Sequence, residues 1–213
     1  MAARAERGLL VHAVRYALTA ARLVTPAYLP QPTPCAGWDL RTLLYHLGDS
    51  MDALSEGLYT GFVQPGAAPR GDERDDGDSD RDRDGDRYGD GDGDGPQPGP
   101  VRGLAERAAT LVCACAAAGS AENRVAIGDR ELTTSLITMT GAVEIAVHGW
   151  DISVTCGGPR AFPPGLASDL LPIAALLAPP SLREGLFAAP VTVPEPSCPT
   201  DRLVGFLGRP PRP

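Results

Sequence analysis

Apolar side chains recur at intervals of three and four residues along most of this chain, which is the period of an α-helix that packs on one face. The clearest stripe follows Asp39, an N-cap candidate, and consists mostly of leucines. The stretches with this pattern are residues 3–24, 40–58, 101–118, 134–156 and 164–178. Four main helices that each have an apolar face predict a mainly all-α fold, a four-helix bundle.

Shorter segments connect and follow these helices. Residues 123–135, NRVAIGDRELTTS, predict a short β-hairpin or an extended connection, because Gly128 and Asp129 form a turn signal. The tail, residues 179–213, is rich in proline and is expected to be mostly extended, with one helical turn near residues 201–207. We expect this C-terminal extension to pack on the bundle.

An acidic insert, residues 64–100, interrupts the helical pattern. It has no aliphatic residue larger than Ala and is rich in Asp, Gly and Pro. Such a segment cannot bury enough apolar surface to offset the entropy that is lost when it is ordered. We therefore predict a disordered insert between the first half of the bundle, residues 1–63, and the second half, residues 101–178.

The charge of the chain is concentrated in this insert. The formal net charge is −8, and the segment from Asp72 to Asp94 alone holds twelve acidic residues and four Arg, so that the rest of the chain is neutral. A neutral folded part gives no support to nucleic-acid binding, which needs a basic surface. No apolar run approaches the ~20 residues that span a membrane, and the N-terminus lacks the continuous apolar segment of a signal peptide. We expect a cytoplasmic protein that binds neither nucleic acid nor membrane.

The stretch GAVEIAVHGWD, residues 141–151, places polar groups in an apolar helix. At about 100° per residue, Glu144, His148 and Asp151 fall within about 60° of one another, on a face that should point into the bundle. A buried ionised Glu is costly unless it is paired or coordinated. Glu144 and His148 can share one divalent metal ion, while Asp151 orients a ligand imidazole. Alternatively, Asp151 is a helix-terminal or surface residue.

A third ligand must come from another helix. The other two histidines of the chain are His12 and His46, and each falls on a predicted helix near its apolar face. Two His and one Glu with an open position form the pattern of a catalytic zinc site. The alternative is a hydrogen bond between Glu144 and His148 inside the core, with His46 on the surface.

Four further side chains are candidates for the surroundings of such a site. Trp38 and Trp150 each follow a glycine, and we interpret both as core or cavity-wall aromatic residues. Arg209 could contact a carboxylate or phosphate, or lie on the surface. Cys35 precedes a helix N-terminus, which can activate a thiol, but Asp39 competes for the same amide groups, and we expect a packed loop residue. The sequence identifies no catalytic residue.

Three segments resemble the signatures of one known family, the mycothiol-dependent maleylpyruvate isomerase family of the DinB-like superfamily. They are TPCAGWDLRTLLYHL at residues 33–47, EIAVHGWDISVTCG at residues 144–157 and DRLVGFLGRPP at residues 201–211. The last of them is similar to the closing segment of the short actinobacterial branch of the family. The acidic insert departs from the usual pattern of the family.

The resemblance implies a DinB-like four-helix bundle with a divalent metal ion, usually zinc, at one end. It implies that the ligands are His46, Glu144 and His148, which leaves His12 as a bystander. It also implies a low-molecular-weight thiol, mycothiol, as a co-substrate. These ligands are among the candidates that the residues themselves suggest, with His46 chosen over His12 by the resemblance.

Three functional hypotheses follow. In the first, the protein is a thiol-dependent metalloenzyme, a transferase or isomerase in which a metal-activated thiol attacks a small electrophilic substrate. In the second, it is a non-catalytic metal-binding module with a structural or sensor role, which a fourth protein ligand would favour. In the third, the bundle binds a small molecule without a metal. Bundles of this type often pair through helix faces, so a homodimer is expected.

Overall fold

Four long helices dominate the structure. The computed structural model describes residues 2–64, 99–120, 122–158, 161–183 and 188–210. The long helices in this part of the chain are α1 (Ala2–Ala21), α2 (Leu40–Thr60), α3 (Gly99–Ala117) and α4 (Thr134–Thr155). Their bounds agree with the apolar stripes of the sequence to within three residues at each end.

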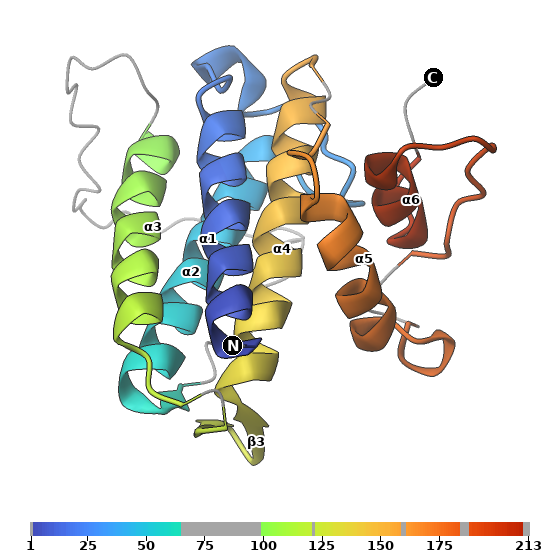
Figure 1. Ribbon diagram of the computed structural model, residues 1–213. Coiled ribbons are helices and arrows are strands. Elements are labelled where there is room, and N and C mark those ends of the chain that lie inside the picture. Colours follow the sequence, from blue (N-terminus) through green and yellow to red (C-terminus); the bar gives the residue numbers. More distant parts are fainter. Residues whose placement is uncertain (1, 65–98, 121, 159–160, 184–187, 211–213) are drawn as a thin grey trace, which may run out of the picture.

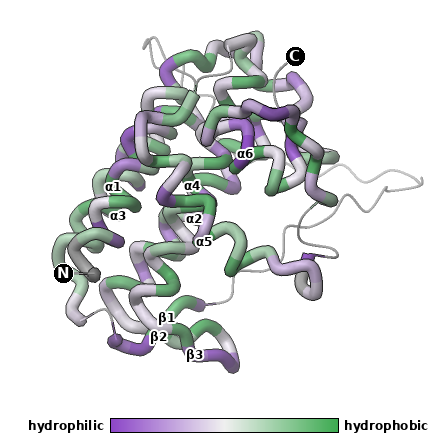
Figure 2. The backbone as a smooth tube through the Cα atoms, turned by 45° about the vertical axis from the view of Figure 1, so that its right-hand side comes forward, coloured by the Kyte–Doolittle hydropathy of each residue, from purple (hydrophilic) through white to green (hydrophobic). Residues whose placement is uncertain are grey.

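These helices form a closed bundle. Helix α1 packs against α4 and α3, and α2 packs against α3 and α4, so that each helix has two neighbours (Figure 1). Figure 2 shows hydrophobic and hydrophilic residues alternating along the helical tubes, as expected where one face of each helix is buried. The stripe of α2 supplies a large part of the core, and its fully buried members are Leu40, Leu43, Leu44, Leu47 and Met51. The predicted mainly α-helical bundle is confirmed.

Side-chain caps define where the two helices with candidate ligands begin. The carboxylate of Asp39 accepts a hydrogen bond of 2.8 Å from the backbone N–H of Thr42, which confirms the predicted N-cap of α2. The hydroxyl of Thr133 accepts a bond of 3.2 Å from the N–H of Leu136 at the start of α4. Each cap satisfies a backbone N–H that lacks a partner within the helix.

A small sheet lies at one end of the bundle. Strands β2 (Arg124–Ile127) and β3 (Arg130–Thr133) form the predicted hairpin, with Gly128 at a positive φ of 60° in its turn. A third strand, β1 (Phe62–Val63), pairs in parallel with β2 and was not predicted. Two residues are too few to show a periodic pattern. Val63, Val125 and Ile137 form a small apolar cluster beneath this sheet.

A shorter helix packs on α4, and another short helix packs on the first. Helices α5 (Leu166–Leu177) and α6 (Pro199–Phe206) contact each other, and α5 contacts α4 (Figure 1). Short 3₁₀ turns lie at Pro26–Tyr28 and Pro180–Leu182. The buried guanidinium of Arg183 joins the two helices, because it donates hydrogen bonds to the carbonyl oxygens of Ala178, Ala188 and Phe206. The last residues of α6 are therefore fixed to the end of α5.

The predicted acidic insert lies almost wholly outside the described residues, which leave out positions 65–98. Within the described residues, no helix is both long enough and apolar enough to cross a lipid bilayer.

Helix α4 lies close to α1 at a glycine, Gly149. A Cβ atom on Gly149 would lie 2.8 Å from the Cα and 3.1 Å from the Cβ of Ala17. Backbone atoms cannot give way at this distance, so the two helix axes depend on the missing side chain. The glycine lies beside His148 and thereby helps to set the depth of that imidazole in the bundle.

We predict that Gly149→Ala lowers the free energy of unfolding by about 1–3 kcal/mol through overpacking, although Ala favours a helix by about 1 kcal/mol over Gly. The control is Gly8→Ala in α1, where an added Cβ meets nothing within 4 Å, and where we expect equal or higher stability. Urea unfolding of both metal-free variants measures the difference. Equal midpoints for the two variants would contradict the close approach of α4 to α1.

Candidate metal centre

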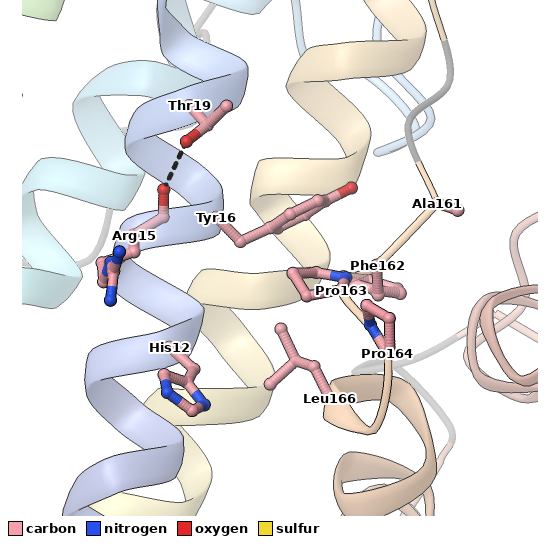
Figure 3. Close-up of a pocket in the computed structure, with 9 residues that line it drawn as sticks. All are labelled: His12, Arg15, Tyr16, Thr19, Ala161, Phe162, Pro163, Pro164 and Leu166. Carbon is pink, nitrogen blue, oxygen red and sulfur yellow. Dashed lines mark hydrogen bonds between the residues drawn. The ribbon is translucent and has the colours of Figure 1, made fainter.

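The three histidines of the chain occupy two separate places. His12 lies on the exposed face of α1 and lines a pocket of about 590 Å³ together with Arg15, Tyr16, Phe162 and Pro163 (Figure 3). Figure 3 shows that this pocket lies between α1 and the segment that precedes α5. His46 and His148 lie instead on α2 and α4, with ring centroids 5.1 Å apart.

Both of these imidazoles meet the carboxylate of Glu144. His46 Nε2 lies 2.7 Å and His148 Nε2 lies 3.1 Å from the same oxygen, Glu144 Oε1. The side chains of His46 and Glu144 are 35% and 37% exposed, whereas that of His148 is only 8% exposed. The cluster therefore lies at the edge of the bundle, with its deepest member on α4.

The charges of this cluster depend on one another. Burial by itself raises the pKa of Glu144, but the charge of His148 and the hydrogen bonds from both imidazoles outweigh this effect and hold the pKa well below its usual range. Burial by itself lowers the pKa of His148, but the charge of Glu144 and a hydrogen bond to Asp151 raise it well above 6.5. In the metal-free protein, the carboxylates of Glu144 and Asp151 on either side of His148 therefore favour the protonated form of its imidazole.

Asp151 lies behind His148 and is completely buried. Its Oδ2 accepts a hydrogen bond of 3.1 Å from His148 Nδ1. Arg209 donates two further bonds of 2.8 Å, from Nε to Oδ1 and from Nη2 to Oδ2. This bidentate geometry is the strong form of a carboxylate–guanidinium pair. The alternative of Asp151 as a surface or helix-terminal residue is therefore excluded, and so is a surface position for Arg209.

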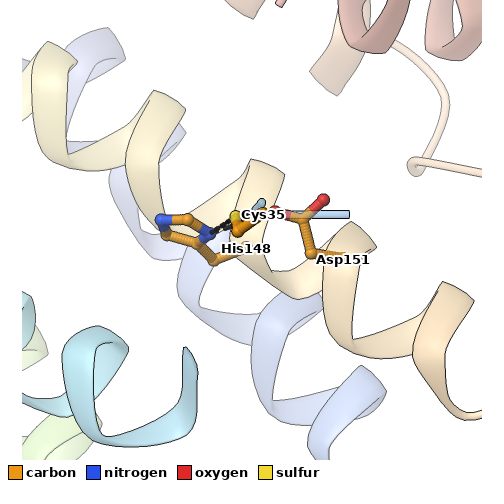
Figure 4. Close-up of side chains that lie close together, drawn as sticks. All are labelled: Cys35, His148 and Asp151. Carbon is orange, nitrogen blue, oxygen red and sulfur yellow. Dashed lines mark hydrogen bonds and ion pairs between the residues drawn. The ribbon is translucent and has the colours of Figure 1, made fainter. Parts of the chain in front are cut away.

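The thiol of Cys35 completes this buried group. Its Sγ lies 3.3 Å from Asp151 Oδ2, 3.3 Å from Arg209 Nη2 and 3.7 Å from His148 Nδ1. Figure 4 shows the sulfur beside the His148 ring, with Asp151 further along α4. We expected a packed loop residue, and no neighbour in the sequence indicated these contacts. The partners of Cys35 are more than 110 residues away along the chain, and only the fold brings them together.

A tight turn before α2 places Cys35 and Trp38. The hydroxyl of Thr33 donates a bond of 2.9 Å to the carbonyl oxygen of Trp38 and accepts one of 3.2 Å from the N–H of Cys35. Gly37 makes the turn possible with a φ of 81°. The indole of Trp38 then lies with its centroid 4.7 Å from the ring of His46 and 6.4 Å from that of His148. Trp38 thus forms a wall beside both imidazoles.

Trp150 lies elsewhere. Its side chain is 2% exposed and belongs to the main hydrophobic core. On an α-helix, a residue two positions from His148 points about 160° away from it. The two GW motifs therefore place their indole rings in different surroundings, one beside the imidazoles and one in the core.

The turn after α6 directs Arg209 back to the bundle. Gly208 has a φ of 82°, and a Cβ there would lie 2.6 Å from the Cβ of Ala188. The N–H of Arg209 donates a bond of 2.9 Å to the carbonyl oxygen of Val204. Arg183 fixes the end of α6 to α5. The segment that carries Arg209 is therefore held in a position from which its guanidinium contacts Asp151.

Two groups of side chains in the described part of the chain offer atoms that could hold a metal ion, and both include His148. We call them the first donor set (His46, Glu144 and His148) and the second donor set (Cys35, His148 and Asp151). In each set the ligand atoms all lie within 4.8 Å of one another. The first set consists of the two His and one Glu that are typical of catalytic zinc sites.

Comparison with known proteins identifies one family. A family model described as the mycothiol maleylpyruvate isomerase N-terminal domain matches residues 10–153, which is more than half of the chain and includes the ligand candidates on α2 and α4. This match confirms the resemblance that the sequence motifs indicated. Comparisons with curated proteins and with solved structures gave no match. Arg209 lies outside the matched residues.

We predict that Asp151→Asn lowers the free energy of unfolding by about 3–5 kcal/mol, because it leaves a buried guanidinium without its counter-charge. The control is Asp52→Asn, which breaks the exposed 2.8 Å pair between Asp52 and Arg107 and should cost less than about 1 kcal/mol. Chemical denaturation of the metal-free proteins measures both effects. Similar losses in the two variants would contradict a dominant role for the buried pair.

We also predict a difference in acid sensitivity. Burial raises the pKa of Asp151, but hydrogen bonds from Arg209 and His148 lower it below its ordinary value of 3.8. A lowered pKa contributes stability that is present above the unfolded value and is lost as the pH falls through the folded value. Below about pH 4, metal-free wild-type protein should therefore lose stability more steeply than Asp151→Asn. Parallel acid limbs in a pH series of denaturation curves would contradict this assignment.

Proposed function

This chain belongs to the mycothiol maleylpyruvate isomerase N-terminal domain family, and from that premise we propose that it is a thiol-dependent metalloenzyme. In this proposal His46, Glu144 and His148 hold a divalent metal ion, zinc. The co-substrate is a low-molecular-weight thiol, mycothiol or a similar molecule. The reaction is a transfer or an isomerisation of a small electrophilic substrate.

The observation that carries the proposal is the convergence of two imidazoles on one carboxylate oxygen. Nε2 of His46 and Nε2 of His148 both lie within 3.1 Å of Glu144 Oε1, although the two histidines belong to different helices. These three side chains present one oxygen and two nitrogen atoms toward a common point. The donor set fits zinc, which prefers imidazole nitrogen and carboxylate oxygen in catalytic sites.

The residues behind His148 prepare it to bind a metal ion. Asp151 accepts a hydrogen bond from the N–H at Nδ1, which leaves Nε2 as the nitrogen for coordination. Arg209 fixes the carboxylate of Asp151 from the other side. Such carboxylate–histidine pairs orient the ligand ring and raise its basicity. Trp38 limits the movement of both imidazoles from a third direction.

Access for small molecules supports catalysis over a purely structural role. His46 and Glu144 are each about one-third exposed, so the first donor set is reachable from solvent. Within the described residues the set has three members, and the nearby Cys35 and Asp151 contact the opposite nitrogen of His148. His46, Glu144 and His148 would hold a divalent ion with an open position, and the ion would supply the positive charge that favours a bound thiolate.

The chain's own residues then position the reactants. Trp38 offers a flat apolar surface beside the imidazoles, against which a small substrate can lie. Arg209 is occupied by Asp151 and Cys35, so its role in this proposal is to position His148 rather than to bind the substrate. The Nδ1 side of His148 is buried and faces Cys35 and Asp151, which limits the access of water to it.

We predict about one zinc ion per chain in wild-type protein, as expected for a single site with three protein ligands. His46→Ala, Glu144→Ala and His148→Ala should each lose the ion, because each removes one of the three donor atoms. His12→Ala is the matched control, since His12 lies in the separate pocket of α1, and it should retain the ion. Elemental analysis of tag-free proteins measures the content. Zinc-free wild-type protein after incubation with zinc would contradict the proposal.

The same four variants test the thiol reaction. Zinc-loaded wild-type protein should accelerate the loss of free mycothiol in the presence of an activated alkene, and His12→Ala should do so equally well. The three ligand variants should be inactive under the same conditions. One bound zinc without acceleration by any low-molecular-weight thiol would instead support the non-catalytic metal-binding module.

A further inference from the structure

The second donor set has the geometry of a metal site in its own right. With Zn–S bonds of about 2.3 Å and Zn–N or Zn–O bonds of about 2.0–2.1 Å, tetrahedral ligands lie roughly 3.3–3.6 Å apart. The observed separations are 3.3 Å between Cys35 Sγ and Asp151 Oδ2, 3.7 Å from Cys35 Sγ to His148 Nδ1, and 3.1 Å between His148 Nδ1 and Asp151 Oδ2. These donor atoms would need to move by only a few tenths of an ångström.

The chemistry of the second donor set is also favourable for zinc. A cysteine thiolate is a softer ligand than a carboxylate, and zinc combines readily with sulfur and imidazole nitrogen. The two donor sets compete for one residue, because the first uses Nε2 of His148 and the second uses Nδ1. A neutral imidazole has one nitrogen available for a metal and keeps its proton on the other. A single metal ion can therefore occupy only one of the two donor sets.

Arg209 occupies the place of a cation in the second donor set. Its Nη2 lies 2.8 Å from Asp151 Oδ2 and 3.3 Å from Cys35 Sγ, and its Nε lies 2.8 Å from Asp151 Oδ1. Two of the three ligand atoms in the set thus face a positive charge already. Because a guanidinium stays protonated in proteins, it cannot yield this place by losing a proton.

We propose that Arg209 keeps a metal ion out of the second donor set and thereby directs the ion to His46, Glu144 and His148. The inference rests on the proposed function, since it assigns the resident ion to the first donor set. Arg209 acts here as a positioning residue that never touches the ion. By holding Asp151 as the acceptor of the hydrogen bond from Nδ1–H, it also keeps Nε2 of His148 available.

The fold stabilises the position of Arg209 beside Asp151. Arg209 follows a turn that requires Gly208, and α6 is tied to α5 through Arg183. The side chain of Arg209 is 13% exposed, so bulk water does not compete strongly for its hydrogen bonds. For an ion to enter the second donor set, Arg209 must leave a buried carboxylate, and Cys35 must release its proton to solvent.

The test is cobalt(II) binding to the full-length protein, followed by absorption spectroscopy. Cobalt(II) substitutes for zinc, and a thiolate ligand produces an intense charge-transfer band in the near ultraviolet. Wild-type protein should bind about one cobalt ion per chain without this band. Arg209→Gln should show the band, and the additional change Cys35→Ser should abolish it. Arg209→Lys keeps the positive charge and should resemble wild-type protein.

A double variant sharpens the experiment. His46→Ala alone should lose cobalt, because Arg209 still blocks the alternative set. His46→Ala combined with Arg209→Gln should bind cobalt again and show the thiolate band, because the ion can then use Cys35, His148 and Asp151. A merely structural role of Arg209 predicts the opposite result, since two damaging changes should bind metal more weakly than one.

The outcomes separate this inference from the proposed function. Wild-type protein that binds no cobalt overturns both, and so does a thiolate band in wild-type protein, because an ion bound by Cys35 cannot also use Nε2 of His148 in the first donor set. A folded Arg209→Gln variant without the band, checked by circular dichroism, overturns this inference alone. If Arg209→Gln does not fold, His46→Ala alone decides the question. It should lose cobalt, and retained cobalt with a thiolate band would show that Arg209 does not keep the ion out of the second donor set.

Discussion

The site in this protein depends on one buried carboxylate. Asp151 is completely buried, and it accepts hydrogen bonds from the imidazole of His148, the guanidinium of Arg209 and the thiol of Cys35. A bare carboxylate in the interior would be strongly unfavourable, and these partners make its charge tolerable. They come from the loop before α2, from α4 and from the segment after α6. A single charge thus ties three distant parts of the chain together beside the candidate metal ligands.

Because Asp151 needs these partners, the site requires both the helical bundle and the C-terminal segment that carries Arg209. The four helices alone can position His46, Glu144 and His148, because these residues lie on α2 and α4. They cannot neutralise Asp151, which needs the guanidinium of Arg209. The interactions of Arg183 and the turn at Gly208 serve this purpose, since they fix the segment that carries Arg209. The family match ends at residue 153 and does not include this segment.

The close packing of α4 has a related consequence. Gly149 permits α1 to approach within a distance that no side chain would allow, and the neighbouring His148 is held deep enough to meet Asp151 on one side and Glu144 on the other. Glu144 and His46 remain near the surface, where a small molecule can reach them. Helix α4 therefore supplies the buried side of the centre and, through Glu144, part of its accessible side. In such a site, the buried contacts orient the imidazole of His148, and the solvent-facing side remains open to small molecules.

Periodicity along the sequence determined the helices, because an apolar face repeats every three to four residues whatever the neighbouring elements are. The spacing of Glu144, His148 and Asp151 likewise follows from the geometry of a single helix. Local chemistry also determined the cap at Asp39 and the turn at Gly128. The two-residue strand β1 had no such signal, because its pairing with β2 depends on a neighbour far along the chain. The contacts of Cys35 and Arg209 could not be predicted either, because their partners also lie far along the chain. A thiol at residue 35 and a guanidinium at residue 209 meet only because the folded bundle brings both to one buried carboxylate, and tertiary structure alone decides that contact.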